Sequence, residues 1–134
     1  MTRNNRRRFT LIEVVVVMMI LVSLAAIATP LYMKYLDDSH VSTAKIQIKA
    51  LSQAVQDYKI ALGSYPDSLD ALITDPGVDG WKGPYFDATV LPGDPWGQPY
   101  VYTLRDDALG FDIMSYGSDK LEGGEGNAAD ISNH

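Results

Sequence analysis

The most restrictive feature of this 134-residue chain is an apolar segment, Phe9 to Tyr32, in which Glu13 is the single charged residue. As a helix rising about 1.5 Å per residue it would extend about 36 Å, enough to cross a hydrocarbon core of about 30 Å. Composition alone is equally compatible with a disposable signal peptide or a plain anchor. However, the helical pattern continues well beyond Pro30, with no small-residue cleavage site followed by a polar start. We therefore expect a membrane helix that the mature protein keeps.

Charge is distributed unevenly along the chain. The formal net charge is -6, and it becomes -10 once the first eight residues, with their four arginines, are set aside. An acidic domain has no general attraction for phosphates, so nucleic-acid binding is not expected. The basic start favours a cytoplasmic N-terminus, with the remainder of the chain on the other side of the membrane. Cysteine is absent, which excludes disulfides and thiolate metal sites.

Glu13 is costly in an apolar span, because a carboxylate at mid-membrane is unfavourable by roughly 2.5 to 3.5 kcal/mol on insertion scales. Its position near the edge of the segment lowers this cost but does not remove it. We expect Glu13 to be paired with a cation.

The chain after Pro30 predicts one small α+β domain. Apolar residues recur at helical spacing and end before Gly63, a typical C-cap residue: Ala44, Ile48, Leu51, Val55, Tyr58 and Leu62. Asp67 or Ser68 is expected to cap a short helix that buries Leu69, Leu72 and Ile73. Residues 77–96 indicate an irregular packed loop, and residues 100–104 and 111–115 predict a hairpin. Two or three strands on one long helix would hide both apolar surfaces.

The run from Gly117 to Ile131 holds the main concentration of metal-competent side chains, with four carboxylates and one amide among glycines. Calcium takes six to eight oxygen ligands from such groups. The spacing does not match an EF-hand, and for an arbitrary sequence a solvated acidic tail is the commoner interpretation. No enzyme is expected, because His40 lies in the long helix and His134 is the last residue, which leaves no positioned base.

The stretch Arg6-Arg7-Arg8-Phe9-Thr10-Leu11-Ile12-Glu13 resembles the class III signal of type IV pilins and pseudopilins. The resemblance implies that a prepilin peptidase cleaves between Arg8 and Phe9 and N-methylates Phe9. Glu13 would then be the fifth mature residue, which in this family pairs with the amine of a neighbouring subunit, and Pro30 would occupy the helix-kink position. The family usually has glycine where this chain has Arg8, which puts the efficiency of cleavage in question.

Two further motifs resemble the major pseudopilins of bacterial type II secretion systems. One is Asp94-Pro95-Trp96-Gly97-Gln98-Pro99-Tyr100, and the other is the pattern Ser-x-Gly-x-Asp followed by Asp-Ile, which resembles their calcium loop. The resemblance implies a calcium site with Asp119 and Asp130 as carboxylate ligands. Ala129 stands where many members have another acid, so Glu125, Asn127, main-chain oxygens or water would replace it. Ser115 and Ser118 are further candidate oxygen sources.

The resemblance implies a pilin-like fold with a leader at 1–8, a transmembrane and filament-core helix at 9–32 and a periplasmic domain at 33–134. The expected function is that of a pseudopilus subunit in the inner membrane, polymerising through its N-terminal helix to drive export of folded periplasmic proteins. The expected partners are copies of the chain in a helical filament, minor pseudopilins, the inner-membrane assembly platform and the prepilin peptidase. The alternatives are a type IV pilin, a competence pseudopilin or a membrane-anchored calcium-binding module.

Overall fold

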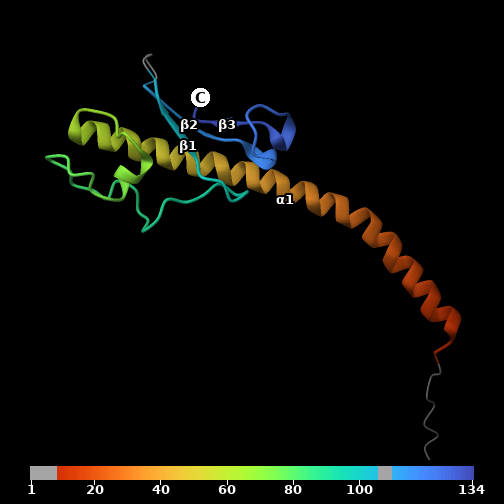
Figure 1. The fold of residues 1–134 in the computed structure, drawn as a ribbon. Helices are drawn as coiled ribbons and strands as arrows, with labels where there is room; N and C mark the ends of the chain where they lie inside the picture. The colour runs from red at the N-terminus through yellow and green to blue at the C-terminus, as the bar shows by residue number, and fades with distance from the viewer. Residues whose placement is uncertain (1–8, 106–109) are drawn as a thin grey trace, which may run out of the picture. The chain divides into compact units, whose positions relative to one another are not determined.

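The computed structural model describes residues 9–105 and 110–134, and the chain divides into two compact units. The first unit ends at Leu36 and the second is Asp37–His134. The long helix α1, Leu11–Leu62, supplies residues to both units (Figure 1). The predicted leader at 1–8, including Arg8, lies outside the described residues. The remaining elements all belong to the second unit: 3₁₀ helix η1 (Leu69–Leu72), β1 (Val101–Leu104), β2 (Phe111–Ser115), 3₁₀ helices η2 (Gly117–Asp119) and η3 (Gly126–Ala128), and β3 (Ile131–Ser132).

The two ends of α1 are set by local hydrogen bonds. At the start, the Thr10 hydroxyl accepts the backbone N–H of Glu13 at 3.3 Å, as an N-cap side chain does. At the far end, the N–H of Gly63 donates to the carbonyl of Lys59 at 2.7 Å, and Gly63 has a φ of 82°. Glycine adopts this left-handed conformation without steric cost, so the predicted end of the helix at Gly63 is confirmed.

The core of the second unit lies between α1 and the elements that follow it. The predicted apolar face of α1 is confirmed, since Ala44, Ile48, Leu51, Val55 and Tyr58 are buried, and Leu62 is partly buried against them. The other buried apolar residues come from α1 itself, η1 and the sheet region: Ala54, Leu69, Ala71, Leu72, Tyr100, Phe111, Ile113 and Ile131. Every core residue therefore belongs to the second unit.

The sheet is antiparallel with strand order β1-β2-β3, and it lies along the second half of α1 (Figure 1). The register pairs Val101 with Met114 and Leu104 with Phe111, which confirms the predicted hairpin. Along β2 burial alternates, so that Phe111, Ile113 and Ser115 are buried. The third strand pairs Ile131 with Ser115, and the fold class is α+β as expected.

The segment predicted as a short capped helix forms a single 3₁₀ turn instead. Ser68 is extended and makes no side-chain cap hydrogen bond, which corrects that prediction. Leu69 and Leu72 are buried as expected, whereas Ile73 is only partly buried at the C-cap. The irregular chain up to β1 is packed by aromatic side chains; for example, Trp81 Nε1 donates to the carbonyl of Ala71 at 3.0 Å.

Candidate functional site

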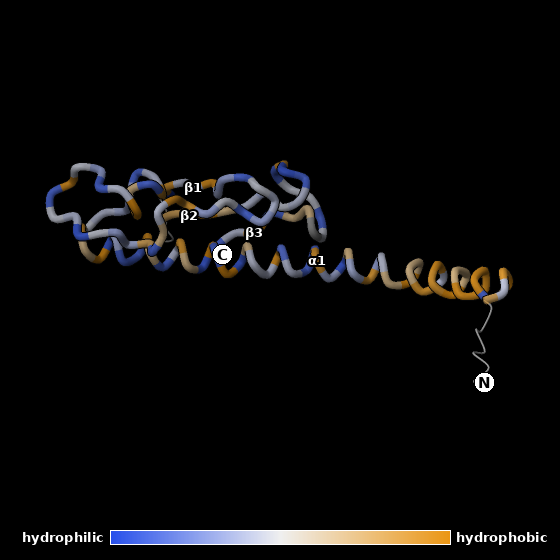
Figure 2. Tube along the Cα trace, turned by 90° about the horizontal axis from the view of Figure 1, so that it is seen from below, coloured by the Kyte–Doolittle hydropathy of each residue, from blue (hydrophilic) through white to orange (hydrophobic). Residues whose placement is uncertain are grey.

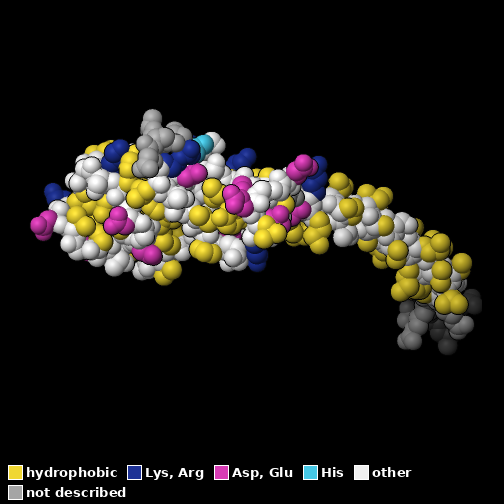
Figure 3. All heavy atoms as spheres, turned by 45° about the horizontal axis from the view of Figure 1, so that its top comes forward, with side chains coloured by type: hydrophobic (Ala, Val, Ile, Leu, Met, Phe, Trp, Pro, Cys, Tyr) yellow, Lys and Arg dark blue, Asp and Glu magenta, His cyan; other side chains and the backbone are white. Residues whose placement is uncertain are grey.

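The N-terminal apolar segment presents its side chains on all sides. Every residue from 9 to 35 is exposed, including Phe9 at 79% and Leu11 at 83%. Figure 2 shows hydrophobic residues along this part of α1, and Figure 3 shows apolar side chains on its surface. By length and composition α1 can cross a membrane. A surface of this kind is stable in lipid or when packed against other helices, and not in water.

Glu13 is the charged residue of the stretch from Phe9 to Tyr32, and it is exposed. Its carboxylate makes no hydrogen bond or ion pair among the described residues, whereas its backbone N–H is held by Thr10. The Thr10-x-x-Glu13 spacing is that of a capping box, a signal in the sequence that indicates where the helix begins. The carboxylate is therefore available to a partner from outside the chain.

Helix α1 continues across Pro30. Proline has no N–H, so the carbonyl of Ala26 cannot receive the usual helical hydrogen bond from residue 30. Next to it, the hydroxyl of Thr29 donates to the carbonyl of Ala25 at 2.8 Å, and that of Ser23 donates to the carbonyl of Met19 at 2.8 Å. These bonds satisfy polar groups that would be unfavourable in an apolar environment.

The acidic loop, Gly117 to Ile131, is folded back on itself through its carboxylates. Asp119 Oδ1 accepts the N–H of Leu121 at 3.1 Å, and Asp130 Oδ2 accepts the N–H of Gly123 at 2.9 Å. The loop is also close-packed, since a Cβ added to Gly124 would lie 2.3 Å from the carbonyl oxygen of Ala128. The two predicted carboxylate ligands thus each stabilise a turn of the same loop.

The acidic loop meets part of the requirement for a cation site. Asp130 Oδ1 is buried and has no hydrogen-bond partner among the described residues, which is the state of an acceptor that a cation would satisfy. Among residues 9–105 and 110–134, no three His, Cys, Asp or Glu side chains are grouped so that they could hold a metal. A calcium ion here would therefore need main-chain oxygens and water in addition to Asp119 and Asp130.

The other predicted oxygen donors are placed differently. Ser118 and Glu125 are exposed, and Glu125 is the N-cap of η3 without a side-chain cap bond. Asn127 lies in η3, and its side chain is outside what the structure describes. The hydroxyl of Ser115 is buried and donates to Asp94, outside the acidic loop. Among the described side chains, Glu125 is therefore not grouped with Asp119 and Asp130, and the hydroxyl of Ser115 is engaged elsewhere.

Asp94 is a buried carboxylate that the sequence marked as the first residue of a motif but not as a site residue. It is 6% exposed, and its Oδ1 accepts the N–H groups of Trp96 at 3.1 Å and Gln98 at 2.7 Å. Its Oδ2 accepts the hydroxyl of Ser115 at 2.6 Å. A signal was present, because Asp before Pro often closes a turn through its side chain, but the sequence does not reveal the bond to Ser115.

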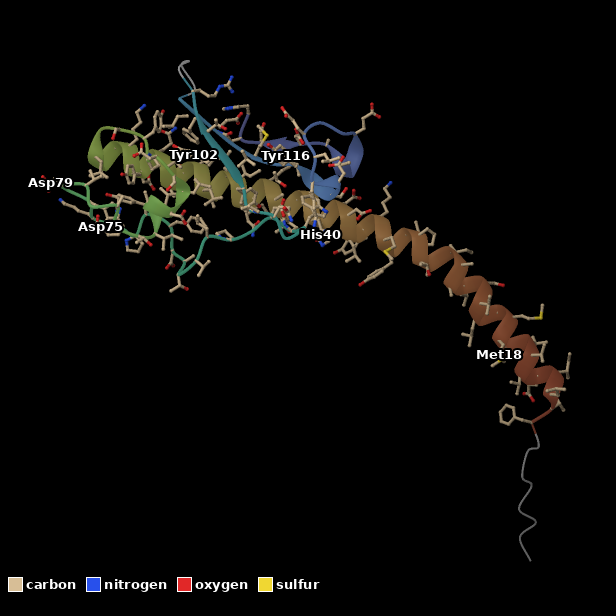
Figure 4. The ribbon with its side chains drawn as sticks, in the orientation of Figure 1. Met18, His40, Asp75, Asp79, Tyr102 and Tyr116 are labelled. Carbon is tan, nitrogen blue, oxygen red and sulfur yellow. The ribbon has the colours of Figure 1, made fainter. Side chains whose placement is uncertain are left out.

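Aromatic residues fix the same turn on α1. Trp96 packs edge-on against His40 of α1, with ring centroids 5.9 Å apart, and Figure 4 labels His40 on the helix. The hydroxyl of Tyr100 donates to Gln47 Oε1. Burial, and secondarily the negative charge of Asp94, raise the pKa of Tyr100. The other histidine, His134, lies 3.3 Å from Asp112 Oδ1.

Comparison with known proteins places both ends of the chain in known families. Residues 31–134 match the family described as "Type II secretion system (T2SS), protein G", and residues 3–29 match the prokaryotic N-terminal methylation motif. The chain is 40% identical to type II secretion system core protein G of Pseudomonas aeruginosa, covering 99% of this chain and 98% of that protein. It is 37% identical to the core protein G of Vibrio cholerae, covering 93% and 89%.

A solved structure supports the same comparison. The crystal structure of the major pseudopilin from the type 2 secretion system of enterohaemorrhagic Escherichia coli matches with a TM-score of 0.59 and 26% identity. The match covers 75% of this chain and 91% of that one.

Proposed function

The chain belongs to the protein G family of the type II secretion system, and we propose how this pseudopilus subunit enters its filament. The family consists of structural pseudopilins and is not an enzyme family. This membership separates the chain from the type IV pilins and competence pseudopilins that the sequence left open. Its role is that of a structural subunit of the pseudopilus.

Entry begins with processing of the N-terminus. A prepilin peptidase cleaves between Arg8 and Phe9 and methylates the new amine, and the match of residues 3–29 to the methylation motif supports this step. Before assembly the chain resides in the inner membrane, with its N-terminus in the cytoplasm and the domain 33–134 in the periplasm. The apolar surface of residues 9–35 supports a membrane location, because every residue of this stretch is exposed in the single chain.

Polymerisation then packs copies of α1 into a helical filament. The carboxylate of Glu13 pairs with the methylated amine of a neighbouring subunit, and the observation that carries this step is its exposure without a partner among the described residues. Two opposite charges in an apolar bundle are each unfavourable alone and much less so together. Minor pseudopilins and the inner-membrane assembly platform are the further partners, and filament growth pushes folded periplasmic proteins across the outer membrane.

Calcium is the cofactor of this subunit in our proposal. Asp119 and Asp130 would hold it, with main-chain oxygens of the acidic loop, and the buried unpartnered Oδ1 of Asp130 supports the assignment. A bound cation would supply charge neutralisation and would cross-link the loop. Because it binds only the folded form, it stabilises the periplasmic domain, which has no disulfide.

The experiment that tests polymerisation is electron microscopy of filaments sheared from cells that produce the chain together with its secretion machinery. The proposal predicts filaments that carry the chain along their length. A chain that stays in the membrane as a monomer would support the alternative of a membrane-anchored calcium-binding module.

A further inference from the structure

Asp94 joins two segments that are distant in the sequence, the turn Asp94 to Tyr100 and the start of the acidic loop. Its Oδ1 closes the turn by accepting the N–H groups of Trp96 and Gln98, and its Oδ2 accepts the hydroxyl of Ser115. We infer that Asp94 is a positioning residue for the acidic loop, which it holds in place through the hydroxyl of Ser115.

Ser115 transmits this constraint because its hydroxyl has two roles at once. It donates to Asp94 Oδ2 at 2.6 Å and accepts the N–H of Gly117 at 3.2 Å. Gly117 is the first residue of η2 and is buried, with a φ of 70°. The chain of hydrogen bonds thus leads from the Asp94 carboxylate to the first backbone amide of the acidic loop.

Burial makes the hydrogen bond between Asp94 and Ser115 costly to break from either side. Asp94 is 6% exposed and Ser115 is 1% exposed, so water cannot replace a lost partner without opening the structure. A buried donor or acceptor left unpaired carries the full cost of its desolvation. Loss of either side chain should therefore destabilise both the turn Asp94 to Tyr100 and the start of the acidic loop.

Of the two segments that Asp94 joins, the turn can hold the other in place because the turn is attached to α1. Trp96 packs on His40, and Tyr100 is hydrogen-bonded to Gln47, both of which lie on α1 within the second unit. The acidic loop has no comparable packing at its surface, since residues 118 to 126 are exposed. The order at the start of the loop accordingly depends on the turn, whereas its end is held by the buried Ile131 of β3.

Hydrogen exchange measured by mass spectrometry on the full chain in detergent micelles, with chelator present, tests this inference without calcium. Ser115→Ala should accelerate exchange at Trp96 and Gln98, on the far side of the hydrogen bond, by about tenfold, and Asp94→Asn should do the same at Gly117. The double variant should exchange no faster than the faster single variant, because both changes break one connection.

Asp75→Asn is the matched control. Asp75 also precedes a proline and accepts the N–H of Gly77 through Oδ1 at 2.8 Å, but it is exposed. It should alter exchange near Gly77 and leave the acidic loop unchanged. Wild-type exchange at Trp96 and Gln98 in Ser115→Ala, or effects that multiply in the double variant, would overturn the inference. If Asp94→Asn fails to fold, Ser115→Ala alone decides.

A calcium titration of the same proteins by calorimetry adds a second readout, and this arm rests on the proposed calcium site. Both single variants should weaken calcium binding by about tenfold, because part of the binding energy would be used to order the loop. The proposed carboxylate ligands are Asp119 and Asp130, whereas the hydroxyl of Ser115, first expected as an oxygen source, is engaged with Asp94. Wild-type affinity in both variants would contradict the positioning role. If the unaltered chain binds no calcium, the calcium proposal fails, and the exchange experiment still decides the role of Asp94.

Discussion

The hydroxyl of Tyr100 donates to Oε1 of Gln47 at 2.5 Å, although the two residues are 53 positions apart. This bond ties the chain just before β1 to α1. Tyr100 is 8% exposed, so its ring also contributes to the core.

Tyr100→Phe should lower the free energy of unfolding of the domain 33–134 by about 1 kcal/mol, because it removes one hydrogen bond and keeps the ring. For a domain of this size, the melting temperature should fall by roughly 4 to 8 °C. Circular dichroism of the fragment checks the change, and Tyr35→Phe, in an exposed residue of α1, is the control. An unchanged melting temperature would mean that the bond makes no net contribution.

Alkaline pH should destabilise the domain through its buried phenols. Burial, followed by the negative charges of Tyr65 and Asp67, raises the pKa of Tyr102 to about 12. Its neutral form is thus favoured in the folded state, so this stabilisation is fully present below an unfolded pKa of about 10 and is lost as pH rises through about 12. Urea unfolding across this range should show a smaller loss for Tyr102→Phe than for the wild type. Identical pH profiles would contradict the assignment.

Patterns confined to one element were sufficient to predict α1 and the hairpin of β1 and β2, but not β3. The helical stripe from Ala44 to Tyr58 reports which face of α1 is buried, because a helix has a fixed period. The strand β3 is only two residues long, and it pairs with the end of β2 through Ser115. So short a strand leaves no period in the sequence.

The candidate sites were also predictable to different degrees, because the sequence reveals local features but not contacts between distant residues. Glu13 stands out because a charge in an apolar segment is visible locally. Asp94 and Ser115 are 21 positions apart, and their bond exists only because the fold brings the turn to the end of β2. The hydroxyl of Ser115, expected near a calcium ion, is engaged with Asp94 for this reason.

Calcium should stabilise the fragment 33–134. At a calcium concentration about a hundred times the dissociation constant, the gain is about 2.7 kcal/mol, or on the order of 10 °C in melting temperature. Asp119→Ala and Asp130→Ala should each abolish most of this shift. Asp79→Ala, in an exposed residue labelled in Figure 4, should preserve it and so controls for loss of charge. Identical melting curves in calcium and in chelator would mean that the loop is a solvated acidic segment.

Cleavage before Phe9 is a separate prediction. Intact mass should be measured after expression with and without the prepilin peptidase. The processed chain should be lighter by the mass of the first eight residues, less the mass gained from the methyl group. Arg8→Gly should raise the cleaved fraction, because the family usually has glycine at that position. Retention of residues 1–8 in both forms would exclude this processing route.

Glu13 directs assembly in this proposal, and the yield of sheared filaments from Glu13→Val, counted by electron microscopy, tests that role. Membrane insertion should be intact, because the change removes a charge from an apolar segment. Filaments should be lost, because the amine of the neighbouring subunit would lack its partner. Ser23→Val is the matched control in the same segment, since it replaces a side chain that is bonded only within its own helix, and it should keep filaments at the wild-type level. Filaments from Glu13→Val at wild-type yield would contradict the account.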